Sequence, residues 1–274
     1  LAQSLRTNKT YTIGLLIPSI DNPYFATIAS EIVFEAKRYG YTVILLDTLE
    51  DEGNESECIN TLLTRSIDGI ILVPCGERPE SLEKIDEQTP IVLIDRYFED
   101  TSLSYICTDN YRGALDGVKL LIENGHKEIL CIRGVPHSMP SKERVKGYID
   151  ALRESGFDTR SRIAGNDYSI TNGYLETKLA IGSPARPTAI FALSNTIMLG
   201  AIRAIGESSL RIPDDVSILS FDNNLFLDFL HPAVTRISQP TKEISQLAVK
   251  ILMERLSDKQ SVPQQIKLPA QIIE

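Results

Sequence analysis

The fold is decided by residues 11–25, whose sequence is Tyr-Thr-Ile-Gly-Leu-Leu-Ile-Pro-Ser-Ile-Asp-Asn-Pro-Tyr-Phe. Residues 13–17 form a short apolar run typical of a strand buried on both faces, and Pro18 ends that strand because proline has no backbone N–H to donate. Asn22 and Pro23 then predict the start of a helix, with asparagine as the N-cap and proline at the first helical position. The stretch therefore predicts a strand, a polar loop and a helix in immediate succession.

The same alternation of strand and helix continues along the chain. Strands are expected at residues 13–17, 41–46, 68–73, 91–94, 128–133, 188–193, 216–221 and 234–237, with one last strand near 265–273. Helices are expected at residues 23–39, 55–65, 79–87, 111–123, 141–155, 171–181, 196–207 and 241–256. Because each parallel pairing needs a crossover helix, this order predicts an α/β fold with doubly wound parallel sheets.

The pattern falls into two similar halves rather than one long sheet. We expect an N-terminal lobe of residues 11–108 plus 239–267, and a C-terminal lobe of residues 109–238 plus 268–274. No linker rich in glycine, serine or proline separates the halves, so we expect multiple short crossovers near residues 108, 239 and 267. A chain that crosses more than once predicts a hinge with a cleft between the lobes.

Composition and charge exclude several classes of protein. The chain has 274 residues, 42% of them hydrophobic, and no apolar run approaches the length of a membrane span. Its formal net charge of −9 argues against this segment alone following a phosphate backbone. The first ten residues lack the apolar core of a signal peptide, although a mature chain whose leader has been removed would look the same. Four separate cysteines, without C-x-x-C spacing, favour free thiols in a reducing cytoplasm.

Catalytic and cofactor motifs are scarce. The sequence contains no phosphate-binding loop, no dinucleotide fingerprint after a strand and no H-E-x-x-H. The acidic run at residues 50–55 does not fit a calcium loop, because Thr48 and Ile59 would take the first and last ligand positions. His137 follows a predicted strand, where loop structure and ligand contact are equally good interpretations. We therefore expect no cofactor, no metal site and no enzymatic activity.

Polar residues at the ends of predicted strands form a clearer pattern. They are Asp95, Ser194, Asn195 and Asp222, and Arg144 is the candidate basic partner. Together with the aromatic residues Tyr24, Phe25 and Phe191, such a set suits a polyhydroxylated small molecule, which offers hydrogen-bonding edges and apolar faces. Any one of these polar residues could simply cap a helix, but the set as a whole favours a ligand site.

A series of short motifs occurs in a fixed order along the chain. The motifs are Ile13-Gly-Leu-Leu-Ile-Pro with Asn-Pro-Tyr-Phe25, Asp68-Gly-Ile-Ile71, Pro90-Ile-Val-Leu-Ile-Asp-Arg96, Asp109-Asn-Tyr-Arg-Gly-Ala114, Gly125-His126, Arg144-Val-Lys-Gly-Tyr148, Arg186-Pro-Thr-Ala-Ile-Phe191, Leu199-Gly200, Pro213-Asp-Asp-Val-Ser217, Phe221-Asp222 and His231-Pro232 with Gln239-Pro240. This ordered series resembles the LacI/GalR family of transcriptional regulators. The match covers nearly the whole chain. It implies a fold like that of type I periplasmic binding proteins, used as the effector-binding and dimerising core of a regulator, most often a repressor.

The resemblance also assigns roles to individual residues. It implies effector contacts at Tyr24, Phe25, Asp95, Arg144, Phe191, Ser194, Asn195 and Asp222. It implies that residues 1–10 are the remnant of a hinge segment, whose Leu5 would enter the minor groove of operator DNA, and that a helix-turn-helix headpiece precedes them. It further implies a homodimer formed through the helix at residues 23–39 and neighbouring faces.

Two positions depart from the family pattern. The family usually has Asn-Asp where this chain has Ser194-Asn195, and Gly where it has Ser220. The loss of a carboxylate at residue 195 changes the charge and donor pattern of the pocket, so no particular sugar is implied. Two other classes remain as alternatives, namely the solute receptor of a sugar importer and an enzyme that uses Asp95, Arg144 and Asp222 for acid–base work.

Overall fold

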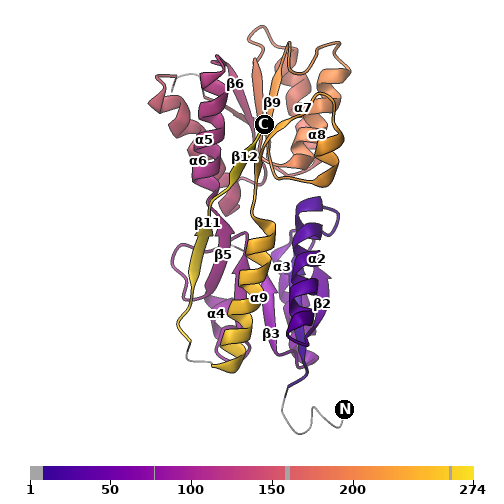
Figure 1. Cartoon of the computed structure of the whole chain (residues 1–274), viewed down its shortest axis with the longest axis vertical. Helices are drawn as coiled ribbons and strands as arrows, with labels where there is room; N and C mark the ends of the chain where they lie inside the picture. Colours follow the sequence, from indigo (N-terminus) through magenta and orange to yellow (C-terminus); the bar gives the residue numbers. More distant parts are fainter. Residues whose placement is uncertain (1–8, 77, 158–160, 259–260) are drawn as a thin grey trace. The chain divides into compact units, whose positions relative to one another are not determined.

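The computed structural model describes residues 9–76, 78–157, 161–258 and 261–274. The chain divides into two compact units, each described here by itself (Figure 1). Unit 1 contains the described residues up to Thr108 together with Pro240–Leu268, and unit 2 contains Asp109–Gln239 and Pro269–Glu274. Each unit is a sheet covered on both faces by helices, so the predicted α/β class is confirmed.

Unit 1 is built on a six-stranded sheet in the order β11-β5-β4-β3-β1-β2, in which every pair is parallel. The strands are β1 (Thr12–Ile17), β2 (Thr42–Asp47), β3 (Gly69–Leu72), β4 (Ile91–Ile94), β5 (Ser104–Thr108) and β11 (Gln265–Leu268). One face carries α2 (Pro23–Arg38) and α9 (Thr241–Ser257), which lie side by side in Figure 1, and the other carries α3 (Glu52–Thr64) and α4 (Glu80–Asp86). Side chains of β1 alternate between these layers, with Leu15 on the α2 face and Leu16 on the other.

Helix α2 begins as its sequence predicts. The side chain of Asn22 accepts a hydrogen bond from the backbone N–H of Tyr24 at 3.0 Å, and Pro23 occupies the first turn. Ile28 and Ile32 face the sheet and are fully buried. The helix ends before Gly40, whose φ of +79° is available to glycine without strain.

Unit 2 repeats this plan with a sheet in the order β12-β10-β9-β8-β6-β7. The strands are β6 (Ile129–Ile132), β7 (Arg162–Ala164), β8 (Ala189–Ala192), β9 (Ser217–Phe221), β10 (Thr235–Ser238) and β12 (Gln271–Ile273). Helices α5 (Asn110–Glu123) and α6 (Met139–Glu154) cover one face, and α7 (Ile170–Ile181) and α8 (Asn195–Gly206) cover the other. A short 3₁₀ helix, η2 (Leu225–Phe229), follows β9.

The prediction of one last strand near residues 265–273 is wrong. Residues 265–273 form two strands in different sheets: β11 pairs parallel to β5 in unit 1, and β12 pairs antiparallel to β10 in unit 2. Pro269 separates them, because it has no N–H for a ladder. The structure also contains β5 and the three-residue β7, which lack a long apolar run and were not expected.

The observed crossing points differ from the expected ones by one residue at two places. Gln239 was expected in the N-terminal lobe but belongs to unit 2, where its side chain donates a hydrogen bond to Asp222. Leu268 was expected in the C-terminal lobe but belongs to unit 1, where it pairs with Thr108 of β5.

Glycine allows α7 and α8 to pack in close backbone contact. A Cβ atom on Gly173 would lie only 2.0 Å from the carbonyl oxygen of Ile197. A Cβ atom on Gly200 would lie 2.1 Å from the carbonyl oxygen of Ile170. The two helices therefore cannot accept even a methyl group at either position without moving apart.

We expect Gly173→Ala to lower the free energy of unfolding by about 1–3 kcal/mol or more, since the added methyl group must displace α8. Gly206→Ala is the matched control, because a Cβ there meets no atom within 4 Å and alanine favours the helix by up to about 1 kcal/mol. Urea denaturation followed by circular dichroism measures both. Equal stability of the two variants would contradict the close contact.

Candidate functional site

The carboxyl edge of the unit 1 sheet carries the expected aromatic and acidic residues. Tyr24 and Phe25 lie in the first turn of α2, directly after β1, and their rings meet edge to face with centroids 5.1 Å apart. The Tyr24 hydroxyl donates a hydrogen bond to a carboxylate oxygen of Asp95 at 2.9 Å. The structure thus brings these three predicted residues together, although they are separated by about seventy positions in the sequence.

Asp95 follows β4 with a φ of +64°, a left-handed conformation that aspartate tolerates better than most residues. Arg96 comes next and is buried. Its guanidinium donates to both carboxylate oxygens of Glu50, at 2.5 and 3.0 Å, and its Nε lies 3.8 Å from Asp95. Glu50 also has a positive φ, +56°. A paired arginine therefore stands beside the acid that the sequence singled out.

Glu55 is a further buried acid of unit 1. Glu55, in the first turn of α3, accepts a hydrogen bond from the backbone N–H of Cys75 at 2.7 Å. Burial raises the pKa of the Glu55 carboxyl, and the hydrogen bond from Cys75 acts in the opposite direction. Burial also raises the pKa of the Cys75 thiol, to about 12, so this thiol stays protonated at neutral pH.

In unit 2, Arg144 is the centre of a buried polar set. Its Nε donates to the side-chain oxygen of Asn110 at 2.8 Å, and its Nη1 donates to the carbonyl oxygen of Leu193 at 2.6 Å. Its guanidinium carbon lies 3.8 Å from the centre of the Phe221 ring, a cation–π contact. The arginine therefore connects α6 with the start of α5 and with the ends of β8 and β9.

Asp222 faces this arginine from the end of β9, again with a positive φ, +74°. The side chain of Gln239 donates to its Oδ1 at 2.5 Å, and the backbone N–H of Asn195 also donates to its carboxylate. Burial raises the pKa of Asp222 above its ordinary value, although Arg144 and these two hydrogen bonds oppose the shift. Asp222 is thus a buried acid that accepts hydrogen bonds from two donors and lies near the positive charge of Arg144.

Ser194 and Asn195 begin α8. Ser194 is the N-cap, and its hydroxyl accepts a hydrogen bond from the N–H of Ile197 at 3.2 Å. The Asn195 side chain is fully buried, and among the described residues neither its oxygen nor its nitrogen has a hydrogen-bond partner. One of the two residues therefore has a clear structural role, and the other has unused hydrogen-bonding capacity.

Tyr168 also lies at this edge, and sequence analysis did not single it out. Its hydroxyl shares a hydrogen bond of 3.1 Å with the hydroxyl of Ser138, the N-cap of α6, and its carbonyl oxygen accepts from Thr196 at 2.5 Å. Its ring packs on Gly134, where a Cβ would lie 2.1 Å from the ring atoms. The tyrosine following Asn166-Asp167 in the loop after β7 was the available signal.

One expected effector contact does not join these sets, and the predicted hinge residue cannot be placed. Phe191 is fully buried in the sheet core, in a cluster with Tyr148 and Phe221, because its side chain points from β8 into the layer under α5 and α6. Leu5 lies outside the described residues.

The described residues contain neither a metal-binding cluster nor a membrane-spanning helix. Among the described residues, no group of three or more His, Cys, Asp or Glu side chains is placed to hold a metal ion. The four cysteines are free thiols. No helix in the described part of the chain is long and apolar enough to cross a membrane.

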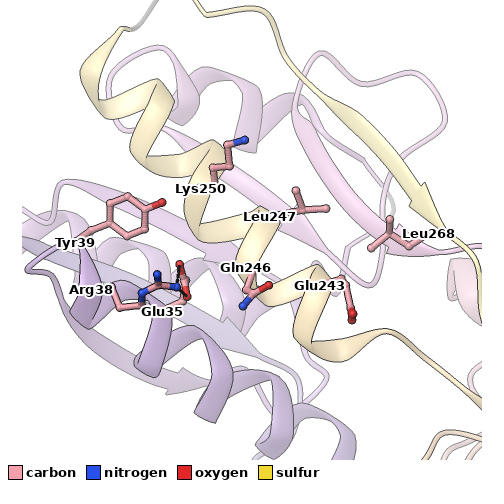
Figure 2. Close-up of a pocket in the computed structure, with 8 residues that line it drawn as sticks. All are labelled: Glu35, Arg38, Tyr39, Glu243, Gln246, Leu247, Lys250 and Leu268. Carbon is pink, nitrogen blue, oxygen red and sulfur yellow. Dashed lines mark hydrogen bonds and ion pairs between the residues drawn. The ribbon is translucent and has the colours of Figure 1, made fainter.

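An open groove of about 430 Å³ lies elsewhere in unit 1, between α2 and α9 (Figure 2). Charged and polar side chains of both helices line it, and Leu268 of β11 is at one end. Glu35 and Arg38 are joined there by an ion pair of 2.9 Å. None of the predicted effector-binding residues lines this groove.

The chain is similar to known proteins over its whole length. Residues 118–274 match the family of periplasmic binding protein-like domains. The chain is 32% identical to the NTD biosynthesis operon regulator NtdR of Bacillus subtilis, over 100% of this chain and 84% of that protein. It is 32% identical to the transcriptional repressor CytR of Escherichia coli, over 93% of this chain and 76% of that protein.

Among solved structures, a LacI family transcriptional regulator from Enterococcus faecium with bound ribose has the same fold, with a TM-score of 0.88. It is 25% identical in sequence, and the superposition covers 96% of this chain and 97% of that one.

The raised pKa of Glu55 predicts a dependence of stability on pH. A carboxyl whose pKa is raised by folding contributes stability below its unfolded pKa, near 4.5, and this contribution is lost as pH rises through the folded pKa. Glu55→Gln keeps an oxygen for Cys75 but cannot ionise. We therefore expect the Glu55→Gln variant to become more stable relative to the unchanged protein as the pH rises from 4 to 8. The measured quantity is the difference between their free energies of unfolding. Glu57→Gln, at an exposed position of α3, should show no such trend in urea denaturation.

Proposed function

The chain belongs to the LacI/GalR family of transcriptional regulators, and from that premise we propose that it is the effector-binding and dimerisation core of a ligand-responsive repressor. The effector that we propose is a sugar or a sugar derivative. The observation that carries this proposal is the buried set around Arg144 and Asp222, which places a guanidinium and a carboxylate near each other at the carboxyl edge of a parallel sheet.

The chemistry of both edges suits a sugar. Carboxylates accept hydrogen bonds from hydroxyl groups, and guanidinium and amide groups donate to their oxygens. Tyr24 and Phe25 in unit 1 add aromatic faces for the apolar side of a ring, next to Asp95. We propose that Arg144, Ser194, Asn195 and Asp222 of unit 2 contact the effector, and Tyr24, Phe25 and Asp95 of unit 1 likewise. Phe191 would support the site from the core.

The regulatory step that we propose is a coupling between effector and DNA. Operator DNA would be bound by a headpiece and by the hinge segment that includes Leu5, so the acidic core itself need not attract phosphate. Such a protein is allosteric only if effector and operator change each other's affinity by the same factor. Equal effector affinity for the free and the DNA-bound full-length protein would defeat this proposal.

The relatives favour this function over a solute receptor. By name, NtdR is an operon regulator and CytR is a transcriptional repressor. We propose that the protein acts in the cytoplasm as a regulator rather than as an enzyme.

We further propose a homodimer through α2 and its neighbouring faces. Val33 and Phe34 on this helix are 47% and 65% exposed, although both are large apolar residues. The adjacent strand β2 is at the edge of its sheet. An apolar helix face beside a sheet edge is typical of a protein–protein contact.

We expect the protein to bind at least one unmodified sugar from a panel of D-ribose, D-xylose, D-galactose and cellobiose in a thermal-shift screen, because a ligand of the folded form raises the unfolding midpoint. Asp222→Ala should lower that affinity at least about thirtyfold, since it removes the buried carboxylate that would accept hydrogen bonds from the effector. Asp214→Ala, an exposed aspartate of the same unit, is the matched control. Unchanged affinity in Asp222→Ala would remove Asp222 from the site.

We expect a dimer at micromolar concentration in analytical ultracentrifugation, and a monomer for Phe34→Glu, because the substitution places a charge in the apolar contact. Thr61→Glu makes the same change of charge on an exposed position of α3 and should remain dimeric. A monomeric unchanged protein, or a dimeric Phe34→Glu, would contradict the proposed interface.

A further inference from the structure

The chain enters unit 1 through a turn that one carboxylate holds. Lys9 is the first described residue, and β1 begins at Thr12. Between them, the carboxylate of Asp68 accepts hydrogen bonds from the backbone N–H and the hydroxyl of Thr10, at 2.9 and 3.0 Å, and from the backbone N–H of Tyr11 at 2.9 Å. Both carboxylate oxygens therefore bind residues that directly precede the strand.

Asp68 is itself fixed by the sheet. It directly precedes β3, and its backbone N–H donates to the carbonyl oxygen of Thr12 at 2.8 Å. Its side chain also forms a hydrogen bond with Tyr41, which directly precedes β2. Burial raises the pKa of Tyr41 to about 12, and the charge of Asp68 acts in the same direction, so the hydroxyl remains a donor at neutral pH. One acid thus ties together the beginnings of the neighbouring strands β1, β2 and β3.

The backbone of Tyr11 shows that partners impose this turn. Tyr11 has a φ of +52°, a left-handed conformation that bulky residues rarely adopt. Its N–H donates to Asp68, and its carbonyl oxygen accepts from the N–H of Thr42 at 2.9 Å. Its ring contacts the ring of Tyr41, with centroids 5.6 Å apart. An unfavourable conformation of this kind persists only where the surroundings fix it.

This anchor lies at the amino edge of the sheet, whereas the proposed effector contacts of unit 1 lie at the carboxyl edge. Tyr11 precedes β1, and Tyr24 follows it. The strand between them is part of the core, where Ile13 and Leu15 are fully buried. The residues before Thr10 therefore leave unit 1 from a point that is fixed to the central strands of its sheet.

We propose that Asp68 is a positioning residue for operator binding, which holds Thr10 and Tyr11 and so sets the point and direction from which the DNA-binding segment leaves unit 1. The inference rests on the proposed function, since it needs a hinge segment and a headpiece ahead of the described residues. A segment that starts from a fixed point loses less freedom on binding than one that starts from a free chain. Asp68 itself does not contact DNA in this proposal, because a carboxylate and a phosphate repel each other.

The test compares Asp68→Ala with Glu83→Ala. Glu83 of α4 is the matched control, because its carboxylate also accepts backbone and hydroxyl hydrogen bonds from two consecutive residues, Thr101 and Ser102, in a different loop of unit 1. Both alanine variants should unfold at a lower temperature than the unchanged protein, since each loses several hydrogen bonds. Asp68→Asn is a milder variant, because its one side-chain oxygen cannot replace both oxygens of the carboxylate.

The first measurement is trypsin cleavage of this chain without DNA, followed by mass spectrometry. Cleavage after Lys9 requires the residues that follow it to leave Asp68, whereas cleavage after Arg6 does not and is the internal reference. We expect Asp68→Ala to be cut after Lys9 about tenfold faster or more, because the rate follows the population of the open form. Asp68→Asn should show a smaller increase, and Glu83→Ala should match the unchanged protein.

The second measurement uses the full-length protein and a DNA duplex that the unchanged protein selects from a random library. We expect Asp68→Ala to bind this duplex about tenfold more weakly, because the segment must first be ordered. The slope of log affinity against log salt concentration should stay the same, since no phosphate contact is removed. Glu83→Ala should bind the duplex normally, and all variants should bind the four sugars named above as the unchanged protein does.

Several results would overturn the proposal. Unchanged cleavage after Lys9 in Asp68→Ala would show that the carboxylate does not hold this turn. Normal affinity for the duplex, or an equal loss of affinity in Glu83→Ala, would assign Asp68 a purely structural role. A shallower salt slope in Asp68→Ala would indicate lost phosphate contacts instead of lost positioning. If the unchanged protein selects no DNA sequence, the proposed function fails and this inference fails with it, although the cleavage after Lys9 would still report the anchor.

Discussion

Neighbouring strands of a parallel sheet end at the same edge, and this constraint gathers the polar side chains of each unit. In unit 1 it brings Tyr24, after β1, to Asp95, after β4. In unit 2 it brings Asn195, after β8, to Asp222, after β9. Because these groups are buried, each needs partners from other elements, and the partners in turn fix the loops. The polar edge is therefore a consequence of strand direction before it is a binding surface.

The two units use different means to hold an acid at that edge. Asp95 accepts a hydrogen bond from the hydroxyl of Tyr24 and lies near the guanidinium of Arg96. That guanidinium also forms an ion pair with Glu50. Asp222 has an amide from Gln239 and the nearby guanidinium of Arg144, which lies on the Phe221 ring. Unit 1 thus pairs its arginine mainly with a second acid, and unit 2 pairs its arginine with neutral oxygens. The second arrangement leaves more of the positive charge to act on Asp222.

The sequence was sufficient where a local pattern alone determines the structure. The apolar run of β1, its proline and the Asn22 cap predicted the first strand and helix, and strand ends predicted Asp95 and Asp222. It was not sufficient where the outcome depends on distant residues. Glu50 meets Arg96 across 46 positions, and β5 is a strand because β4 and β11 flank it. Phe191 was expected at the ligand, but the alternation of β8 turns its side chain into the core. The split of residues 265–273 between two sheets has no local signal beyond Pro269.

Asp95 and Asp222 share a left-handed backbone directly after a central strand of their sheets. In that conformation the Cβ atom of most residues is strained, and glycine, asparagine and aspartate are the types that accept it at little cost. Few residue types are therefore tolerated at these two positions. A change from aspartate to asparagine removes a charge and keeps the loop conformation. A change to a residue that tolerates the left-handed conformation poorly, such as glutamate, would also alter the backbone of the turn. Substitutions that change ligand preference among related proteins should consequently occur mainly at neighbouring residues with ordinary backbone angles. The two left-handed positions should keep a small set of residue types and the same backbone conformation.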